Sequence, residues 1–290
     1  MKKDIYQTIT DSIIDALERV SLEDYQPPFA RLTSQQLPIN PITEKAYNGI
    51  NTLILWLQQH NQGYTSNEWG TFKQWKEQGA QVKKGETSTM IIFYKQLENK
   101  DSTGNQNKPN YFHMIKSYCV FNDDQVDEYT PSTGVESGNV GTVDTIEHIE
   151  SFIENSGAVI EQGTSGACYI PLADKIEMPG KELFFDNGQT ATENYYATLL
   201  HELTHWTGGT KRLNRELTGK TSKESYAFEE LIAELGSAFL CSQFSIMQHG
   251  QDDHAIYLKS WLQALRNDKK YIFKASSQAQ KAVDYLNQTK

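Results

Sequence analysis

The sequence predicts an α+β protein that is built from two domains. Two strand-like runs, 88–95 and 111–122, face each other across a polar insert in the first half, whereas helical periodicity dominates the second half. Between the halves lies a stretch that is poor in large apolar residues and rich in glycine, serine and threonine, which is typical of a linker. We therefore expect a first domain at 1–128, a linker at 129–144 and a second domain at 145–290.

The composition indicates a folded protein that does not span a membrane. The 290 residues suffice for one large or two ordinary domains, and 38% of them are hydrophobic. No apolar run approaches the roughly 18 residues of a membrane-spanning helix, and the first residues lack the apolar core of a signal peptide. The three cysteines are far apart and form no C-x-x-C pair, so we expect no disulfide framework and a location in the reducing cytoplasm.

Short periodic segments separated by breakers make up the first domain. Four prolines interrupt the chain between the first two helices, where we expect an extended loop without regular structure: Pro27, Pro28, Pro38 and Pro41. The elements expected in order are helices at 4–19, 51–60 and 71–78, a turn at 82–86, and a hairpin of the two strands with a polar tip at 99–110.

Helices dominate the second domain, with a small group of strands near its start. The elements expected in order are a helix at 145–155, strands at 158–160, 167–170 and 175–178, a helix within 192–208, and helices at 225–244, 254–266 and 268–287. The helix within 192–208 carries the chain's most informative motif.

That motif is His201-Glu202-Leu203-Thr204-His205, an H-E-x-x-H sequence. On a helix, residues i and i+4 lie on one face, so the two imidazoles can bind one metal ion, and Glu202 can act on a water at that ion. Thr190 followed by Glu193 predicts a capping box, which supports the helix. The alternative is that His201 and His205 are two surface histidines on an ordinary helix.

A catalytic zinc ion usually has three protein ligands, so a third residue must complete the site. The metzincin pattern continues with a glycine and a third histidine. Gly208 matches the glycine, but Lys211 occupies the position of the histidine, and a protonated lysine cannot bind a metal. The metzincin interpretation therefore fails.

A carboxylate from the helix at 225–244 is the other source of a third ligand. Glu230 and Glu234 are four residues apart and share one face, whereas Glu229 lies about 100° around the helix and is the least constrained. We assign Glu230 as the third ligand and Glu234 as the carboxylate that accepts a histidine N–H. The exchange of these two roles, or three ordinary solvated glutamates, remain alternatives.

Such a site predicts metal-dependent hydrolysis. Zn²⁺, or another divalent metal such as Mn²⁺, would lower the pKa of a bound water to about 7, and Glu202 would be the general base. The strand at 167–170 could be a sheet edge beside the cleft, where an extended peptide could add as a further strand.

The segment 69–95 is basic and aromatic, although the whole chain has a net charge of −10. Five of its residues are lysines and two are glutamates, and aromatic residues interleave with them or lie just before them: Tyr64, Trp69, Phe72, Trp75, Phe93 and Tyr94. Aromatic side chains in a basic groove are typical of single-strand binding. Composition alone favours the alternative, in which the aromatic residues form a core and the lysines a solvated face.

Eight segments of the chain resemble ArdC-type antirestriction proteins. They are spread along nearly the whole chain: 4–18, 37–51, 67–86, 118–127, 167–179, 195–208, 212–215 and 226–241. The resemblance implies a first domain that binds single-stranded DNA, as on primases of conjugative plasmids, and a second domain that is a zincin-like metallopeptidase. Proteins of this family travel on plasmids and other mobile elements and help incoming DNA to survive host restriction.

The resemblance also implies site residues. The metal site would comprise His201, Glu202, His205 and a ligand from 229–235. The candidate DNA contacts are Tyr47, Asn51, Trp69, Lys73, Trp75, Lys83 and Lys84. Where the family usually has a Trp-Pro-Trp-like cluster, this chain has the sequence Tyr25-Gln26-Pro27-Pro28-Phe29.

We therefore expect an antirestriction-type protein with single-stranded DNA as a partner and, if it is a peptidase, a protein substrate. Because the chain is acidic, DNA binding must depend on a local patch. Two alternatives remain: a metallopeptidase whose first domain binds protein, and a DNA-protection factor whose metal is purely structural. The sequence leaves open whether peptidase activity exists.

Overall fold

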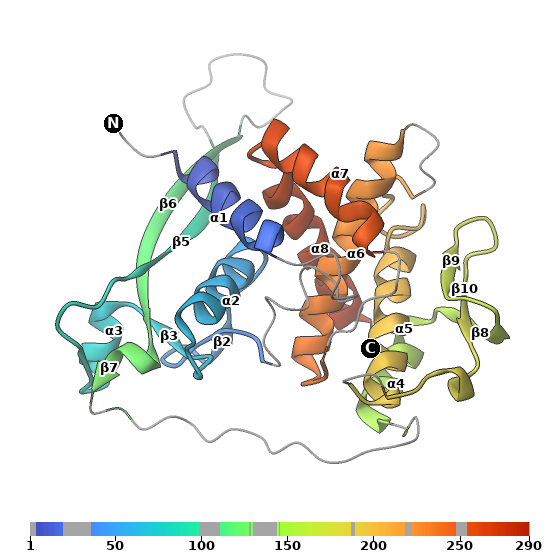
Figure 1. Ribbon diagram of the computed structural model, residues 1–290, viewed down its shortest axis with the longest axis horizontal. Helices are drawn as coiled ribbons and strands as arrows, with labels where there is room; N and C mark the ends of the chain where they lie inside the picture. The colour runs from blue at the N-terminus through green and yellow to red at the C-terminus, as the bar shows by residue number, and fades with distance from the viewer. Residues whose placement is uncertain are drawn as a thin grey trace. The chain divides into compact units, whose positions relative to one another are not determined.

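The computed structural model describes residues 4–19, 36–98, 111–127, 129, 144, 146–186, 189–217, 222–247 and 254–289 (Figure 1). The predicted hairpin tip at 99–110 and the aromatic sequence at 25–29 lie outside these residues, as does the predicted linker except for residues 129 and 144. The described chain mixes helices and sheets, which confirms the α+β class.

The chain folds as two compact units. The helical unit comprises the described residues within Met1–Leu37, Asn48–Leu57 and Val135–Lys290, and the hairpin unit those within Pro38–Tyr47 and Gln58–Gly134. Helix α2 (Ile50–Gln62) therefore contributes to both units. The predicted domain boundaries are a different, sequence-based division and stay a prediction.

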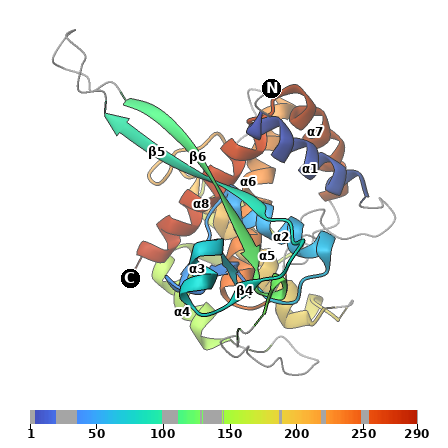
Figure 2. The ribbon, with the colours of Figure 1, turned by 90° about the vertical axis from the view of Figure 1, so that its left-hand side faces the viewer.

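Antiparallel pairing organises the hairpin unit. Its long strands are β5 (Thr89–Glu98) and β6 (Tyr111–Asn122), which pair from Thr89↔Val120 to Glu98↔Tyr111. Figure 2 shows them as one extended, twisted ribbon. The shorter elements are β1 (Ile39–Asn40) with β2 (Lys45–Ala46), β3 (Trp69–Gly70) beside β6, β4 (Gln81–Val82) with β7 (Val126–Asp127), helix α3 (Phe72–Glu77) and the 3-10 helix η1 (Asp123–Gln125).

A small core holds α3 against these strands. The helix starts at a capping box, in which Thr71 accepts from the backbone N–H of Gln74 and the Gln74 side chain accepts from the Thr71 N–H. On α3 the fully buried Trp75 packs with Ala80 and Val126 and donates its indole N–H to Phe121 O at 3.0 Å. The tryptophan therefore anchors the helix to the sheet.

The helical unit combines helices with one three-stranded sheet. Its helices are α1 (Ile5–Arg19), α4 (Glu147–Ser156), α5 (Ala191–Thr207), α6 (Lys223–Gln243), α7 (His254–Asn267), α8 (Tyr271–Gln288) and the 3-10 helix η2 (Lys181–Leu183). The strands β8 (Val159–Thr164), β9 (Cys168–Ile170) and β10 (Lys175–Pro179) form the sheet in the order β8-β10-β9. The central strand β10 is parallel to β8 and antiparallel to β9. Because β9 pairs only with β10 in this sheet, it is an edge strand.

Helices α5 and α6 pack closely because small groups meet at their crossing. The predicted capping box of Thr190 and Glu193 starts α5. On α6 the buried Gly236 lies against Thr204, where an added Cβ would come within 2.5 Å of the Thr204 Cγ2 atom. Apolar residues of both helices are buried around this contact: Leu199, Leu200, Leu203, Leu231 and Leu235. The close approach positions the motif helix against the glutamate-rich helix.

The predicted helices and long strands are confirmed, with ends that shift by a few residues. Two details differ from the prediction. The proline-rich segment contains the two-residue pair β1–β2, and Val82, predicted in a turn, lies in β4 opposite Val126. Two-residue strands are too short to leave a periodic pattern, and the partner of β4 also lies far along the chain.

Among the described residues, no helix is long and apolar enough to cross a membrane.

Replacing Gly236 by alanine should destabilise the helical unit by about 1–3 kcal/mol through overpacking against Thr204. The loss should appear in chemical denaturation even though alanine favours a helix by about 1 kcal/mol over glycine. Thr204→Ser removes the clashing methyl group and keeps the hydroxyl, which donates to Leu200 O at 2.8 Å. The double variant should regain most of the stability, and a double variant as unstable as Gly236→Ala would contradict the proposed clash.

Candidate metal centre

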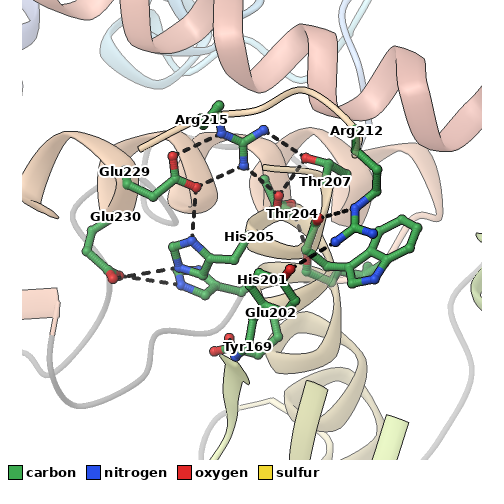
Figure 3. Close-up of polar contacts among 12 residues, drawn as sticks. Tyr169, His201, Glu202, Thr204, His205, Thr207, Arg212, Arg215, Glu229 and Glu230 are labelled. Atoms are coloured by element: carbon green, nitrogen blue, oxygen red, sulfur yellow. Dashed lines mark hydrogen bonds and ion pairs between the residues drawn. The ribbon is translucent and has the colours of Figure 1, made fainter. Parts of the chain in front are cut away.

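The structure brings together the two histidines of α5 and one glutamate of α6. Potential ligand atoms of His201, His205 and Glu230 all lie within 4.8 Å of one another. His201 Nε2 is 3.6 Å from Glu230 Oε2, and His205 Nε2 is 3.6 Å from Glu230 Oε1 (Figure 3). Among the described residues, this is the one group of three or more histidine, cysteine or acidic side chains with such spacing.

The donor set fits a divalent metal ion. In a tetrahedral site with metal–ligand distances of about 2.1 Å, neighbouring ligand atoms are separated by about 3.4 Å, close to the 3.6 Å observed for both histidine–glutamate pairs. Two imidazole nitrogens and a carboxylate oxygen suit zinc and also manganese. Lys211, which excludes the metzincin pattern, is exposed in the turn after α5.

Glu229, predicted as the least constrained of the three glutamates, is buried and lies against His205, and this corrects the prediction. Its Oε1 atom is 3.1 Å from His205 Nδ1, the ring nitrogen opposite the one that faces Glu230. Arg215 donates to both oxygens of this buried carboxylate, at 2.9 and 2.8 Å. Glu234 is fully buried on α6, and its predicted role as acceptor of a histidine N–H stays a prediction.

The error has a physical origin. Helical spacing correctly places Glu229 on another face of α6 from Glu230, but that face is also covered, because the turn after α5 folds over it and supplies Arg215. A local signal was present, since an Arg-Leu-Asn-Arg turn follows the motif helix. The contact of Arg215 with Glu229 could be identified only in the tertiary structure.

Electrostatics couple the histidines to the glutamates. Burial lowers the pKa of His205, but the charge of Glu230 and the bonds to Glu229 and Glu230 outweigh burial and raise this pKa well above its ordinary value. Burial raises the pKa of Glu230, and the two histidines more than reverse that effect, so the pKa lies below its usual range. Because a histidine must be neutral to bind a metal, metal binding would release a proton and weaken as the pH falls.

Glu202 lies beside this group and contacts the edge strand. It is buried, and its Oε2 atom accepts a hydrogen bond of 2.8 Å from the backbone N–H of Tyr169 on β9. A cavity of about 170 Å³ opens here, lined by Ala167, Cys168, Tyr169, Pro171, His201, Glu202, His205, Leu217, Tyr226, Glu230 and Tyr257. The proposed base, the candidate ligands and the sheet edge therefore share one cavity.

Two of the predicted DNA contacts are core residues, which corrects the prediction. Trp69 and Trp75 are both fully buried, so neither ring can stack on a base in this structure. Tyr47 is half-buried and donates its hydroxyl to Trp69 O at 2.8 Å, and Asn51 is half-buried on α2. Tyr47 therefore supports the fold of its segment.

The three predicted lysines lie at the surface of the hairpin unit. Lys73 is 85% exposed in its side chain and pairs with Glu77 one helical turn away, at 3.5 Å. Lys84 is exposed, and Lys83 donates to Asp124 O at 2.9 Å from an exposed position. These positively charged groups are therefore accessible to a partner.

Two aromatic side chains on the β5–β6 ribbon are exposed, and the prediction did not include them as contacts. Phe93 is 52% and Tyr118 46% exposed, and their rings lie edge to face with centroids 6.5 Å apart. Lys116, also exposed, is the cross-strand partner of Phe93, so all three side chains share one face. Only the strand register makes this grouping visible.

Comparisons with known proteins agree with this architecture. The family described as the N-terminal domain of anti-restriction factor ArdC matches residues 3–121, and the family described as zincin-like metallopeptidase matches residues 147–278.

Two relatives match nearly all of this chain but differ in how much of their own length the match covers. The uncharacterized protein y4eC of Sinorhizobium fredii is 38% identical, over 98% of this chain and 92% of that protein. The DNA primase TraC of Escherichia coli is 33% identical over 99% of this chain, but the match spans only 27% of the primase.

Solved structures extend the likeness to three dimensions. The metal-free crystal structure of the antirestriction protein ArdC from plasmid R388 is 36% identical with a TM-score of 0.80, and covers 99% of this chain and 97% of that one. The Mn(II)-bound structure of the same protein is 35% identical with a TM-score of 0.77, and covers 99% and 98%. The chain therefore belongs to the ArdC family of antirestriction proteins and pairs an ArdC N-terminal domain with a zincin-like metallopeptidase domain.

Proposed function

We propose that this protein protects incoming DNA of a mobile element such as a plasmid against restriction by binding single-stranded DNA and by using a divalent metal held by His201, His205 and Glu230. The observation that carries the metal part is the convergence of these three side chains, with ligand atoms within 4.8 Å of one another. The Mn(II)-bound relative supports a divalent metal of this kind, and zinc is the other candidate.

A divalent metal bound there would supply a Lewis acid that lowers the pKa of a bound water. Glu202, held at the cavity wall by the Tyr169 N–H, is placed to take a proton and return it to a leaving group. His205 would bind through Nε2 while Glu229 holds its Nδ1–H, which keeps the ring in the required tautomer. These roles fit a hydrolase that acts on a protein or peptide.

An extended peptide remains the expected form of such a substrate. The strand β9 is a sheet edge beside the cavity, as the sequence predicts for strand addition. Its outward N–H at Tyr169 is already bonded to Glu202. A peptide would therefore have to use other backbone groups of this edge or displace Glu202 from Tyr169.

The hairpin unit is the proposed DNA-binding part. Exposed Lys73, Lys83 and Lys84 provide charge for phosphates, and Phe93 with Tyr118 provides surfaces on which bases can stack. We place this activity in the cytoplasm, where the three free cysteines fit a reducing environment.

Glu230→Gln should remove most divalent-metal binding, as should His201→Ala, because each deletes one of three ligands. Titration calorimetry with Mn(II) and metal analysis of purified protein would measure this loss. Glu234→Gln is the matched control on the same helix face and should keep its metal. Metal loss in Glu234→Gln with retention in Glu230→Gln would reverse the assignment of the two glutamates.

The variant Glu202→Ala distinguishes a catalytic metal site from a purely structural one. If the site is catalytic, the variant should bind Mn(II) like the wild type yet lose protection of incoming plasmid DNA in a transformation assay with a restricting host. Full protection by Glu202→Ala, combined with loss of stability in His201→Ala, would instead favour a purely structural metal.

Replacing Lys83 and Lys84 by glutamate should weaken binding of a single-stranded oligonucleotide and flatten its salt dependence, because fewer phosphates are neutralised. Fluorescence anisotropy at several salt concentrations measures both effects. Lys259→Glu with Lys281→Glu, two exposed positions on α7 and α8, is the control with the same change in charge. Equal affinities for both double variants would favour a first domain that binds protein.

A further inference from the structure

The turn at 212–215, directly after the motif helix, carries two arginines with different targets. We propose that both are positioning residues of the metal centre: Arg215 orients the ligand His205 through Glu229, and Arg212 orients Glu202 through Tyr169. The proposal rests on the proposed metal site and assigns the supports that hold its ligand and its base.

The turn folds back on the end of α5. Leu213 N donates to Thr207 O at 2.9 Å, and Arg215 N donates to Gly208 O at 2.9 Å. The glycines leave room for the arginine heads: a Cβ at Gly209 would lie 2.2 Å from Arg212 Nη2, and one at Gly208 would lie 3.0 Å from Arg215 Nη2. Both guanidinium groups are therefore packed against the helix end.

Arg215 forms the first support. Its Nε donates to Glu229 Oε2 at 2.9 Å and its Nη2 donates to Glu229 Oε1 at 2.8 Å. Nη1 donates to Thr207 Oγ1 and Nη2 also to Thr204 O, which ties the guanidinium to α5 (Figure 3). The oxygen Glu229 Oε1 also lies 3.1 Å from His205 Nδ1. The Arg215 guanidinium thus holds the Glu229 carboxylate, which in turn holds the His205 imidazole.

Arg212 forms the second support. Its guanidinium lies over the Trp206 ring, 3.8 Å from the centroid, and its Nε donates to Trp206 O. Its Nη1 donates to Asp174 Oδ2 at 3.1 Å, and its Nη2 donates to the Tyr169 hydroxyl at 2.9 Å. The Tyr169 hydroxyl in turn donates to Asp174 Oδ1 at 2.9 Å. Arg212 therefore joins the β9–β10 connection to the motif helix.

The edge strand transmits this support to Glu202. The backbone N–H of Tyr169 points away from β10 and donates to Glu202 Oε2 at 2.8 Å. A shift of the Tyr169 ring would move that N–H and release the carboxylate. Because Arg215 contacts α5 and α6, and Arg212 contacts α5 and the β9–β10 connection, the two effects should be separable.

The test uses Arg212→Lys and Arg215→Lys, which keep the charge, lie in the same turn and serve as controls for each other. Arg215→Lys should weaken Mn(II) binding about 10–100-fold, the usual effect of losing support behind a metal ligand, and should leave exchange of the Tyr169 amide unchanged. Arg212→Lys should accelerate that exchange about tenfold or more, as expected for a lost local hydrogen bond, and leave Mn(II) affinity unchanged. Titration calorimetry and amide hydrogen exchange of metal-free protein provide the two measurements.

Two further variants guard against general loss of structure. Glu229→Gln should reproduce the affinity loss of Arg215→Lys, and Tyr169→Phe, which removes only the hydroxyl, should reproduce the exchange of Arg212→Lys. The inference is wrong if each arginine variant changes both the Mn(II) affinity and the exchange of the Tyr169 amide. It is also wrong if Arg215→Lys leaves the affinity unchanged and Arg212→Lys leaves the exchange unchanged. The proposed metal site stands in both cases. If wild type and His201→Ala bind Mn(II) equally, the proposed site itself fails together with the role of Arg215, and amide exchange still decides the role of Arg212.

Discussion

The close packing of α5 against α6 is the constraint on which the candidate metal centre depends. Gly236 lets the helices approach at Thr204, and this approach brings Glu229 and Glu230 to the two histidines of the motif. Burying carboxylates is costly, and removing one partner of a buried pair typically costs about 3–5 kcal/mol. The imidazoles and Arg215 offset that cost, so the charges that prepare the site also hold the helices in register.

The hairpin unit uses its aromatic residues in two ways. Trp69 and Trp75 are buried, and Trp75 fastens α3 to the sheet, so both residues support the fold of the unit. Phe93 and Tyr118 lie on the ribbon with Lys116 and remain exposed. In a chain of net charge −10, this division matters for the proposed DNA binding, because attraction for DNA would have to come from a defined patch and not from the protein as a whole.

The candidate base and the candidate ligands are held from opposite sides. The edge strand β9 holds Glu202 through a backbone N–H, whereas α6 supplies Glu230 and the carboxylate behind His205. The turn that follows α5 contacts both sides, through Arg212 at Tyr169 and Arg215 at Glu229. A site assembled in this way has its geometry in place without a metal, which would lower the cost of ordering the proposed ligands around a divalent ion.

The sequence by itself determined the elements and the motif, because these depend on local spacing. The capping box of Thr190 with Glu193 and the i, i+4 histidines identify α5, and the periodic helices and long strands appear where predicted. The contact of Glu229 with His205 and Arg215 and the burial of two tryptophans were decided only by tertiary structure. A helical pattern states which residues share a face, but what covers that face, such as Arg215 over Glu229 or Val126 against Trp75, comes from segments outside that helix.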